Sequence, residues 1–181
     1  MSATKVQSRT LILAAGLGWI AGFGLGASSH ASAGDPCNLE AQMNFGPGNN
    51  TVYDTDDGDD ENNNWHGQDG QDFLRSLACN DNPVEGNDHA DDVGGGSAFD
   101  SVDGGPVRDN VYGGANHDNI YGGGGPDFLR DDESPDMDNA YGGSENDFID
   151  VLDFDGDDLV NGQGGVDDCF WDTGDSRLNC E

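Results

Sequence analysis

The sequence contains very little positive charge. Among 181 residues there are 6 Lys and Arg against 37 Asp and Glu, which gives a formal net charge of −31. Such a chain is a poor partner for nucleic acid and for anionic membranes, and it attracts hard cations such as Ca²⁺. The sequence also lacks the H-E-x-x-H and G-x-S-x-G signatures of metalloproteases and lipases. We therefore expect a cation-binding protein that is not an enzyme.

Long apolar runs are absent except near the N-terminus. Lys5 and Arg9 precede an uncharged run, Thr10 to Leu25, and Ala31-Ser32-Ala33 provides small residues for cleavage. This order predicts a signal peptide over residues 1–33, cleaved before Gly34, and hence secretion with no stable membrane insertion afterwards. The alternative is a retained anchor, but the run is short for a membrane span. Retention in a periplasm or at the cell surface stays open.

Cysteine is scarce, and all four cysteines follow the predicted leader. An even number in an exported protein indicates disulfides, and four cysteines allow three connectivities. We favour Cys37–Cys79 and Cys169–Cys180, because each pair joins near neighbours at one end of the repeat region.

A nine-residue period organises the rest of the chain. Five units run without interruption over residues 86–130, and further units follow over 133–150 and 153–170 after two-residue insertions, with one outlying unit at 67–75. Position eight of every unit is apolar, and position one is usually Gly. Position six is always aspartate: Asp72, Asp91, Asp100, Asp109, Asp118, Asp127, Asp138, Asp147, Asp158 and Asp167.

Each unit therefore predicts a Gly-rich turn of about six residues and a strand of about three, with the middle side chain pointing inward. A fixed period favours stacked coils over a meander, because equivalent residues then lie above one another. We expect an all-β, parallel β-roll over residues 86–170. An irregular acidic segment (34–85) precedes it, and a disulfide-stapled cap (171–181) follows.

Calcium is the cation that this spacing favours. Aspartates stacked in adjacent coils lie about 4.7–4.9 Å apart, and calcium binds oxygen at about 2.3–2.6 Å, so an ion midway between two carboxylates would contact both. Magnesium requires about 2.0–2.1 Å. One inward residue in nine gives a thin core, so we expect Ca²⁺ to be needed for folding.

Several units resemble a known calcium-binding repeat. The segments 113–120, 122–129 and 142–149 are similar to the haemolysin-type (RTX) nonapeptide G-G-x-G-x-D-x-U-x. The resemblance implies a right-handed parallel β-roll with two units per coil and Ca²⁺ held at both edges by position-six aspartates and turn carbonyls. One edge would then carry Asp91, Asp109, Asp127, Asp147 and Asp167, and the other Asp100, Asp118, Asp138 and Asp158.

The sequence departs from the family pattern in two ways. Glycine at position four is replaced in most units, so we expect fewer ions than aspartate pairs. The insertions Asp131-Asp132 and Val151-Leu152 are expected to disturb neighbouring sites, which would concentrate the ions between Asp91 and Asp127.

Tyr112, Tyr121 and Tyr141 occupy position nine, on the outer face. A cross-strand aromatic ladder is the expected arrangement, with a sugar-binding platform as the alternative.

The function predicted from the sequence is that of a secreted protein whose repeats fold around Ca²⁺. A calcium-dependent adhesion or matrix module with an extracellular glycan or protein partner is the first alternative. A small secreted hydrolase is the second, although residues 34–65 are too few for a catalytic domain.

Overall fold

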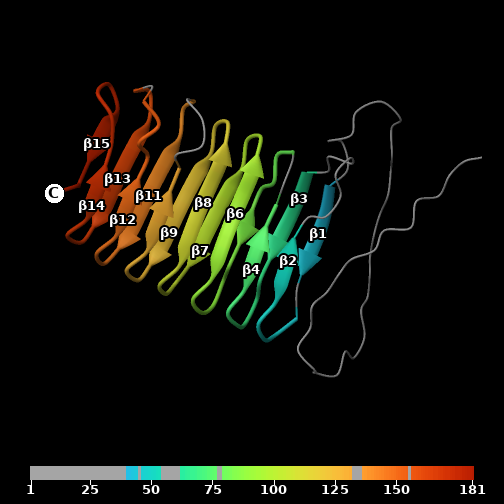
Figure 1. Ribbon diagram of the computed structural model, residues 1–181. Coiled ribbons are helices and arrows are strands. Elements are labelled where there is room, and N and C mark those ends of the chain that lie inside the picture. Colours follow the sequence, from blue (N-terminus) through green and yellow to red (C-terminus); the bar gives the residue numbers. More distant parts are fainter. Residues whose placement is uncertain (1–39, 45, 54–61, 77–78, 132–135, 155) are drawn as a thin grey trace, which may run out of the picture.

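The computed structural model describes residues 40–44, 46–53, 62–76, 79–131, 136–154 and 156–181. This part of the chain is all-β and forms a parallel β-solenoid without a helix (Figure 1). No helix in the described part of the chain is long and apolar enough to cross a membrane. The predicted signal peptide, residues 1–33, lies outside the described residues.

Two parallel sheets form the two walls of the solenoid, and successive strands alternate between them. The first sheet contains β1 (Glu40–Asn44), β3 (Asn62–His66), β5 (Val84–Glu85), β7 (Ser101–Gly105), β9 (Asn119–Gly124), β11 (Asn139–Ser144), β13 (Leu159–Gly164) and β15 (Ser176–Leu178). The second contains β2 (Thr51–Tyr53), β4 (Phe73–Arg75), β6 (Asp92–Ser97), β8 (Asn110–Ala115), β10 (Phe128–Arg130), β12 (Phe148–Asp150) and β14 (Asp168–Phe170).

The strand register confirms a β-roll with two units per coil. Val93 pairs with Val111, and Val102 with Ile120, so residues two units apart lie side by side. Across the first insertion Ile120 pairs with Ala140, and the apolar positions stay aligned. The insertion therefore does not shift the side chains of β11 to the other face of the sheet.

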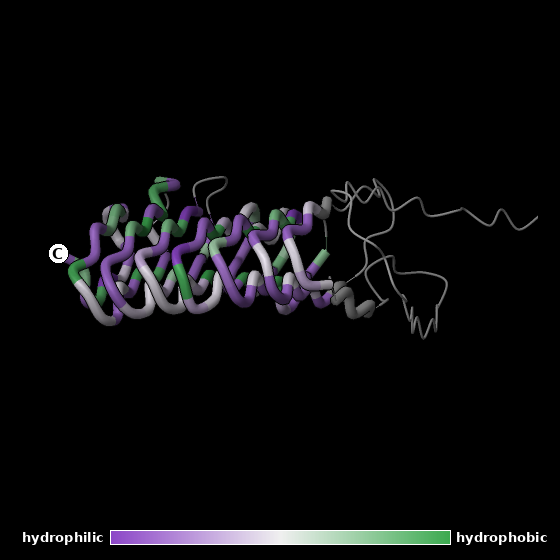
Figure 2. Tube along the Cα trace, turned by 90° about the horizontal axis from the view of Figure 1, so that it is seen from below, coloured by the Kyte–Doolittle hydropathy of each residue, from purple (hydrophilic) through white to green (hydrophobic). Residues whose placement is uncertain are grey.

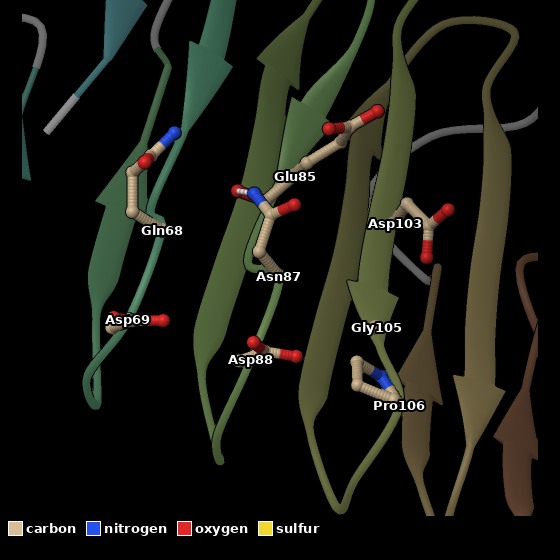
Figure 3. A pocket seen from close by; sticks show the side chains of 8 residues that line it. All are labelled: Gln68, Asp69, Glu85, Asn87, Asp88, Asp103, Gly105 and Pro106. Carbon is tan, nitrogen blue, oxygen red and sulfur yellow. Dashed lines mark hydrogen bonds between the residues drawn. The ribbon is translucent and has the colours of Figure 1, made fainter. Parts of the chain in front are cut away.

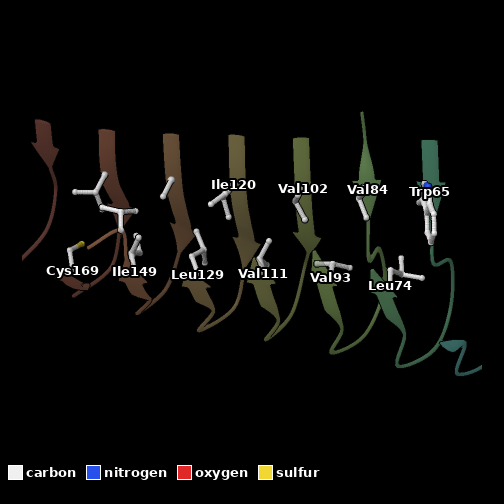
Figure 4. Close-up of a cluster of buried hydrophobic side chains, with 13 residues drawn as sticks. Trp65, Leu74, Val84, Val93, Val102, Val111, Ile120, Leu129, Ile149 and Cys169 are labelled. Carbon is white, nitrogen blue, oxygen red and sulfur yellow. The ribbon is translucent and has the colours of Figure 1, made fainter. Parts of the chain in front are cut away.

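Position-eight side chains form the core, a single row from each sheet that meets inside the coil (Figure 4). Burying a Val, Leu or Ile side chain contributes about 1.5–3 kcal/mol, but each unit supplies only one. Hydrophilic residues make up much of the remaining trace (Figure 2). The buried row is Leu74, Val93, Val102, Val111, Ile120, Leu129, Ala140, Ile149, Val160 and Cys169, and it continues to Val84 and Trp65.

The roll extends further towards the N-terminus than the repeat predicts. A further coil unit begins at Ser76 and ends at Glu85; among its described residues, Asp81 takes position six and Val84 pairs with Val102 at position eight. Strands β1, β2 and β3 add further pairs before it. An extra residue between Asp81 and Val84 hides this unit from an alignment on nine residues.

The predicted Cys169–Cys180 disulfide is present at the C-terminal end, with an S–S distance of 2.04 Å. Strand β15 pairs with β13 and completes the last coil. Cys79 is also disulfide-bonded. Its predicted partner, Cys37, lies outside the described residues.

The tyrosines divide between the two sheets. Tyr121 and Tyr141 stack with ring centroids 5.2 Å apart, as a cross-strand ladder requires. Tyr112 lies on the other sheet, 6.3 Å from the Phe128 ring and 4.5 Å from the Arg75 guanidinium carbon. The expectation of one ladder of three tyrosines was therefore wrong, because successive units occupy opposite walls.

Candidate metal centre

The position-six aspartates form two buried ladders, one along each edge of the roll. In the first, the backbone N–H of Asp91 donates to Asp109 Oδ1 (2.7 Å), and that of Asp109 to Asp127 Oδ1 (2.9 Å). The second repeats this contact from Asp100 to Asp118 (2.7 Å). The first ladder is Asp72, Asp91, Asp109, Asp127, Asp147 and Asp167; the second is Asp81, Asp100, Asp118, Asp138 and Asp158. This matches the assignment of edges that the resemblance to the RTX nonapeptide implied.

Sequence reasoning missed the members at the ladder ends. Asp81 begins the second ladder, and the backbone N–H of Asn50 donates to Asp72 Oδ1 (2.6 Å) in the first. At the other end, the N–H of Asp158 donates to Asp175 Oδ1 (3.2 Å). An alignment restricted to complete nonapeptides excludes all three positions, although each lies one to three residues before a strand.

The second carboxylate oxygen of most ladder members has a different environment. These Oδ2 atoms are fully buried, and among the described residues none has a hydrogen-bond donor. They belong to Asp72, Asp91, Asp100, Asp109, Asp118, Asp127, Asp147 and Asp167, whose exposed fractions are 0–4%. A buried ionised carboxylate is costly unless a cation or a proton compensates its charge.

The glycine at position one makes room for this oxygen. A methyl group built on Gly86 would lie 2.6 Å from Asp91 Oδ2 and 2.6 Å from the carbonyl oxygen of Gly104 in the next coil. The two oxygens are thus no more than about 5 Å apart, the span of two calcium–oxygen bonds. Gly104 has the same relation to Asp109 Oδ2 (2.8 Å) and the Gly122 carbonyl (2.9 Å). Each such gap brings two hydrogen-bond acceptors together, which a cation can satisfy.

This geometry differs from the one expected from the strand spacing. The expected ion lay midway between stacked carboxylates, but the backbone N–H of the preceding aspartate already binds Oδ1. The oxygens left for a cation are therefore Oδ2 and a glycine carbonyl. Both are hard ligands that suit Ca²⁺.

Comparisons with protein-family models, curated proteins and solved structures find no match.

Burial changes the acidity of the ladders. Desolvation raises the pKa of Asp91 to about 7, of Asp100 to about 8 and of Asp127 to about 8, although a hydrogen bond from a backbone N–H opposes each rise. The largest effects are in the second ladder, where desolvation raises the pKa of Asp118 and of Asp138 to about 9. Without a cation these carboxyls would hold protons near neutral pH.

One part of the second ladder gathers three carboxylates. Asp118, Asp131 and Asp138 are all buried, and one carboxylate oxygen from each lies within 4.8 Å of the others. This cluster of buried aspartates could bind a metal ion. Asp131 belongs to the first insertion, which was expected to disturb a site and not to supply a ligand.

A second acidic site is an open pocket of about 400 Å³ on the outside of the first sheet (Figure 3). Asp69, Glu85, Asp88 and Asp103 line it, and Glu85 Oε2 lies 2.7 Å from His66 Nδ1. Burial, followed by the charge of Glu85, raises the pKa of Asp103. Water reaches these carboxylates and can solvate them, so they need a cation less than the ladders do.

Proposed function

We propose that this chain is an exported protein whose β-roll folds around calcium ions, in the manner of the RTX repeats that its nonapeptides resemble. The observation that supports this most directly is the row of buried Oδ2 atoms opposite glycine carbonyls. A hard cation between the carboxylate oxygen and the carbonyl oxygen would bind both acceptors and so stabilise the folded chain.

The coordination chemistry favours calcium over magnesium. Magnesium keeps most of its water, whereas calcium accepts six to eight oxygens in flexible geometry. Position-six carboxylates and position-one carbonyls would supply part of that set. The role of the ion would be structural.

Export fits both the disulfide and the need for calcium. The Cys169–Cys180 bond is typical of an oxidising compartment outside the cytosol. A ligand that binds only the folded chain stabilises it by mass action, so the roll would fold where calcium is plentiful.

Calcium removal tests this proposal. At pH 8 with a chelator, we expect circular dichroism of the oxidised protein to show little β-structure, and added Ca²⁺ to restore it. Asp109→Asn should lower the number of ions bound in calorimetry, because it removes a ladder charge while keeping a side-chain acceptor.

The matched control is Asp88→Asn, which removes one charge from the exposed outer pocket and should leave the stoichiometry unchanged. A chelated protein with the same spectrum and melting temperature as the calcium-loaded one would refute the proposal.

A further inference from the structure

The residue at position one determines what fills the gap beside each ladder carboxylate. In position one, the backbone N–H donates to the position-nine carbonyl of the next coil, as Gly86 does to Asp103 (2.9 Å). Asp131 makes the same contact with Asp150 (2.8 Å), and Val151 with Phe170 (3.1 Å). The first residue of each insertion therefore occupies position one, and its side chain points into the coil.

Asp131 consequently brings a carboxylate into a space that no side chain occupies in the coils with glycine at position one. A methyl group built on Gly113 would lie 2.0 Å from Asp131 Oδ2 and 3.0 Å from Asp118 Oδ2. The N–H of Gly114 also donates to Asp131 Oδ2 (3.3 Å). The contacts hold Asp131 Oδ2 inside the roll, with Asp131 only 3% exposed.

We propose that Asp118, Asp131 and Asp138 form a calcium site distinct from the other ladder gaps, the first to fill as calcium rises. This inference rests on the proposed function for the identity of the cation. Besides the clustering of three carboxylates, Asp118 itself points to a ligand. It is completely buried, and its Oδ2 has no hydrogen-bond partner among the described residues although it faces the cluster.

Charge explains why this site binds more tightly than the glycine gaps. Each glycine gap combines a carboxylate with a neutral carbonyl, whereas this site contains three carboxylates within 4.8 Å. Calcium affinity in proteins rises with the number of charged ligands and with the rigidity of the site. Asp136 adds a further negative charge near Asp118 and Asp138.

The test is a calcium titration of the oxidised protein by calorimetry at pH 7.5. We expect one ion per chain to bind at least tenfold more tightly than the rest. Asp131→Asn should abolish that tight class and leave the weaker sites. Asp168→Asn, which removes an exposed charge on β14, should retain it.

A second variant tests whether a loss of tight binding reflects a misfolded chain and not the missing carboxylate. Asp131→Gly places at position one the residue that most other coils carry there, so the variant should show the wild-type circular dichroism in saturating calcium and still lack the tight class. A tight class that survives both changes, or a single uniform class in the wild type, would overturn the inference. If no calcium binds at all, the proposed function fails as well; if one ion binds and depends on Asp131 alone, the ladder proposal fails and this site stands.

Discussion

The coil that contains Ser76 and the coils that carry glycine at position one solve the same problem differently. The Ser76 N–H donates to the Gly94 carbonyl (3.1 Å), as position one requires. Its hydroxyl lies within hydrogen-bond distance of both Asp81 Oδ2 and the Gly95 carbonyl oxygen, which share its single proton. In the glycine coils the corresponding carboxylate and carbonyl oxygens face each other with no side chain between them.

We infer from this difference that the position-one side chain sets how strongly each coil would depend on a cation. A hydroxyl satisfies the buried carboxylate in the Ser76 coil, and Asp131 adds a charge that increases the demand for a cation. Val151, which is 1% exposed, fills the same position with an apolar side chain and joins the core. Under the proposed function, the roll would combine coils of different cation dependence along one stack, each contributing to the stability of its neighbours.

The pH dependence of stability without calcium should show the largest effect. Desolvation raises the pKa of seven ladder carboxyls from 3.8 to values between about 6 for Asp147 and about 9 for Asp118. The folded state therefore binds more protons than the unfolded one. Their contribution is fully present below pH 3.8 and is lost as pH rises through 6 to 9.

We expect the chelated protein to lose several kcal/mol of unfolding free energy between pH 5 and pH 9, since each pKa unit corresponds to about 1.4 kcal/mol. Urea denaturation at pH 5, 7 and 9 measures this. In saturating calcium the decline should be much smaller, because the ion stabilises the charged carboxylates. Equal slopes with and without calcium would show that the ladders do not bind it.

Exchanging the position-one residue should have the next largest effect. A methyl group on Gly104 would lie 2.7 Å from the Asp109 β-carbon, so Gly104→Ala should cost about 2–3 kcal/mol with or without calcium. Gly104→Ser introduces the same crowding together with a hydroxyl, as in the Ser76 coil. We therefore expect the serine variant to be more stable than the alanine variant in chelator, and the two to differ less in calcium. Urea midpoints at pH 8 measure both differences, and identical midpoints in chelator would contradict the role of the hydroxyl.

Much of the fold, but less of the site, could be predicted from the sequence. The fixed distance from Asp to the apolar residue predicted the strand positions and the core row, and the resemblance to the RTX nonapeptide implied the two ladders. The ten-residue unit around Asp81 was missed because the period there is broken and position one is Ser76. Asp131 was counted as an insertion, although backbone pairing places it in position one. The hydrogen bonds to Oδ1 come from backbone N–H groups, which are the same for every residue type and leave no trace in the sequence.

Removing the Ser76 hydroxyl should have the smallest effect of the three. Ser76→Ala deprives Asp81 Oδ2 and the Gly95 carbonyl of a hydrogen-bond donor, so it should cost about 1–2 kcal/mol. Trp65, which is 1% exposed on the strand beside β5, reports unfolding of this end by fluorescence. Ser101→Ala, at an outward position on β7, is the matched control and should change little. If the two variants unfold at the same urea concentration, the hydroxyl does not stabilise its coil, and the contrast with the glycine coils no longer explains their need for calcium.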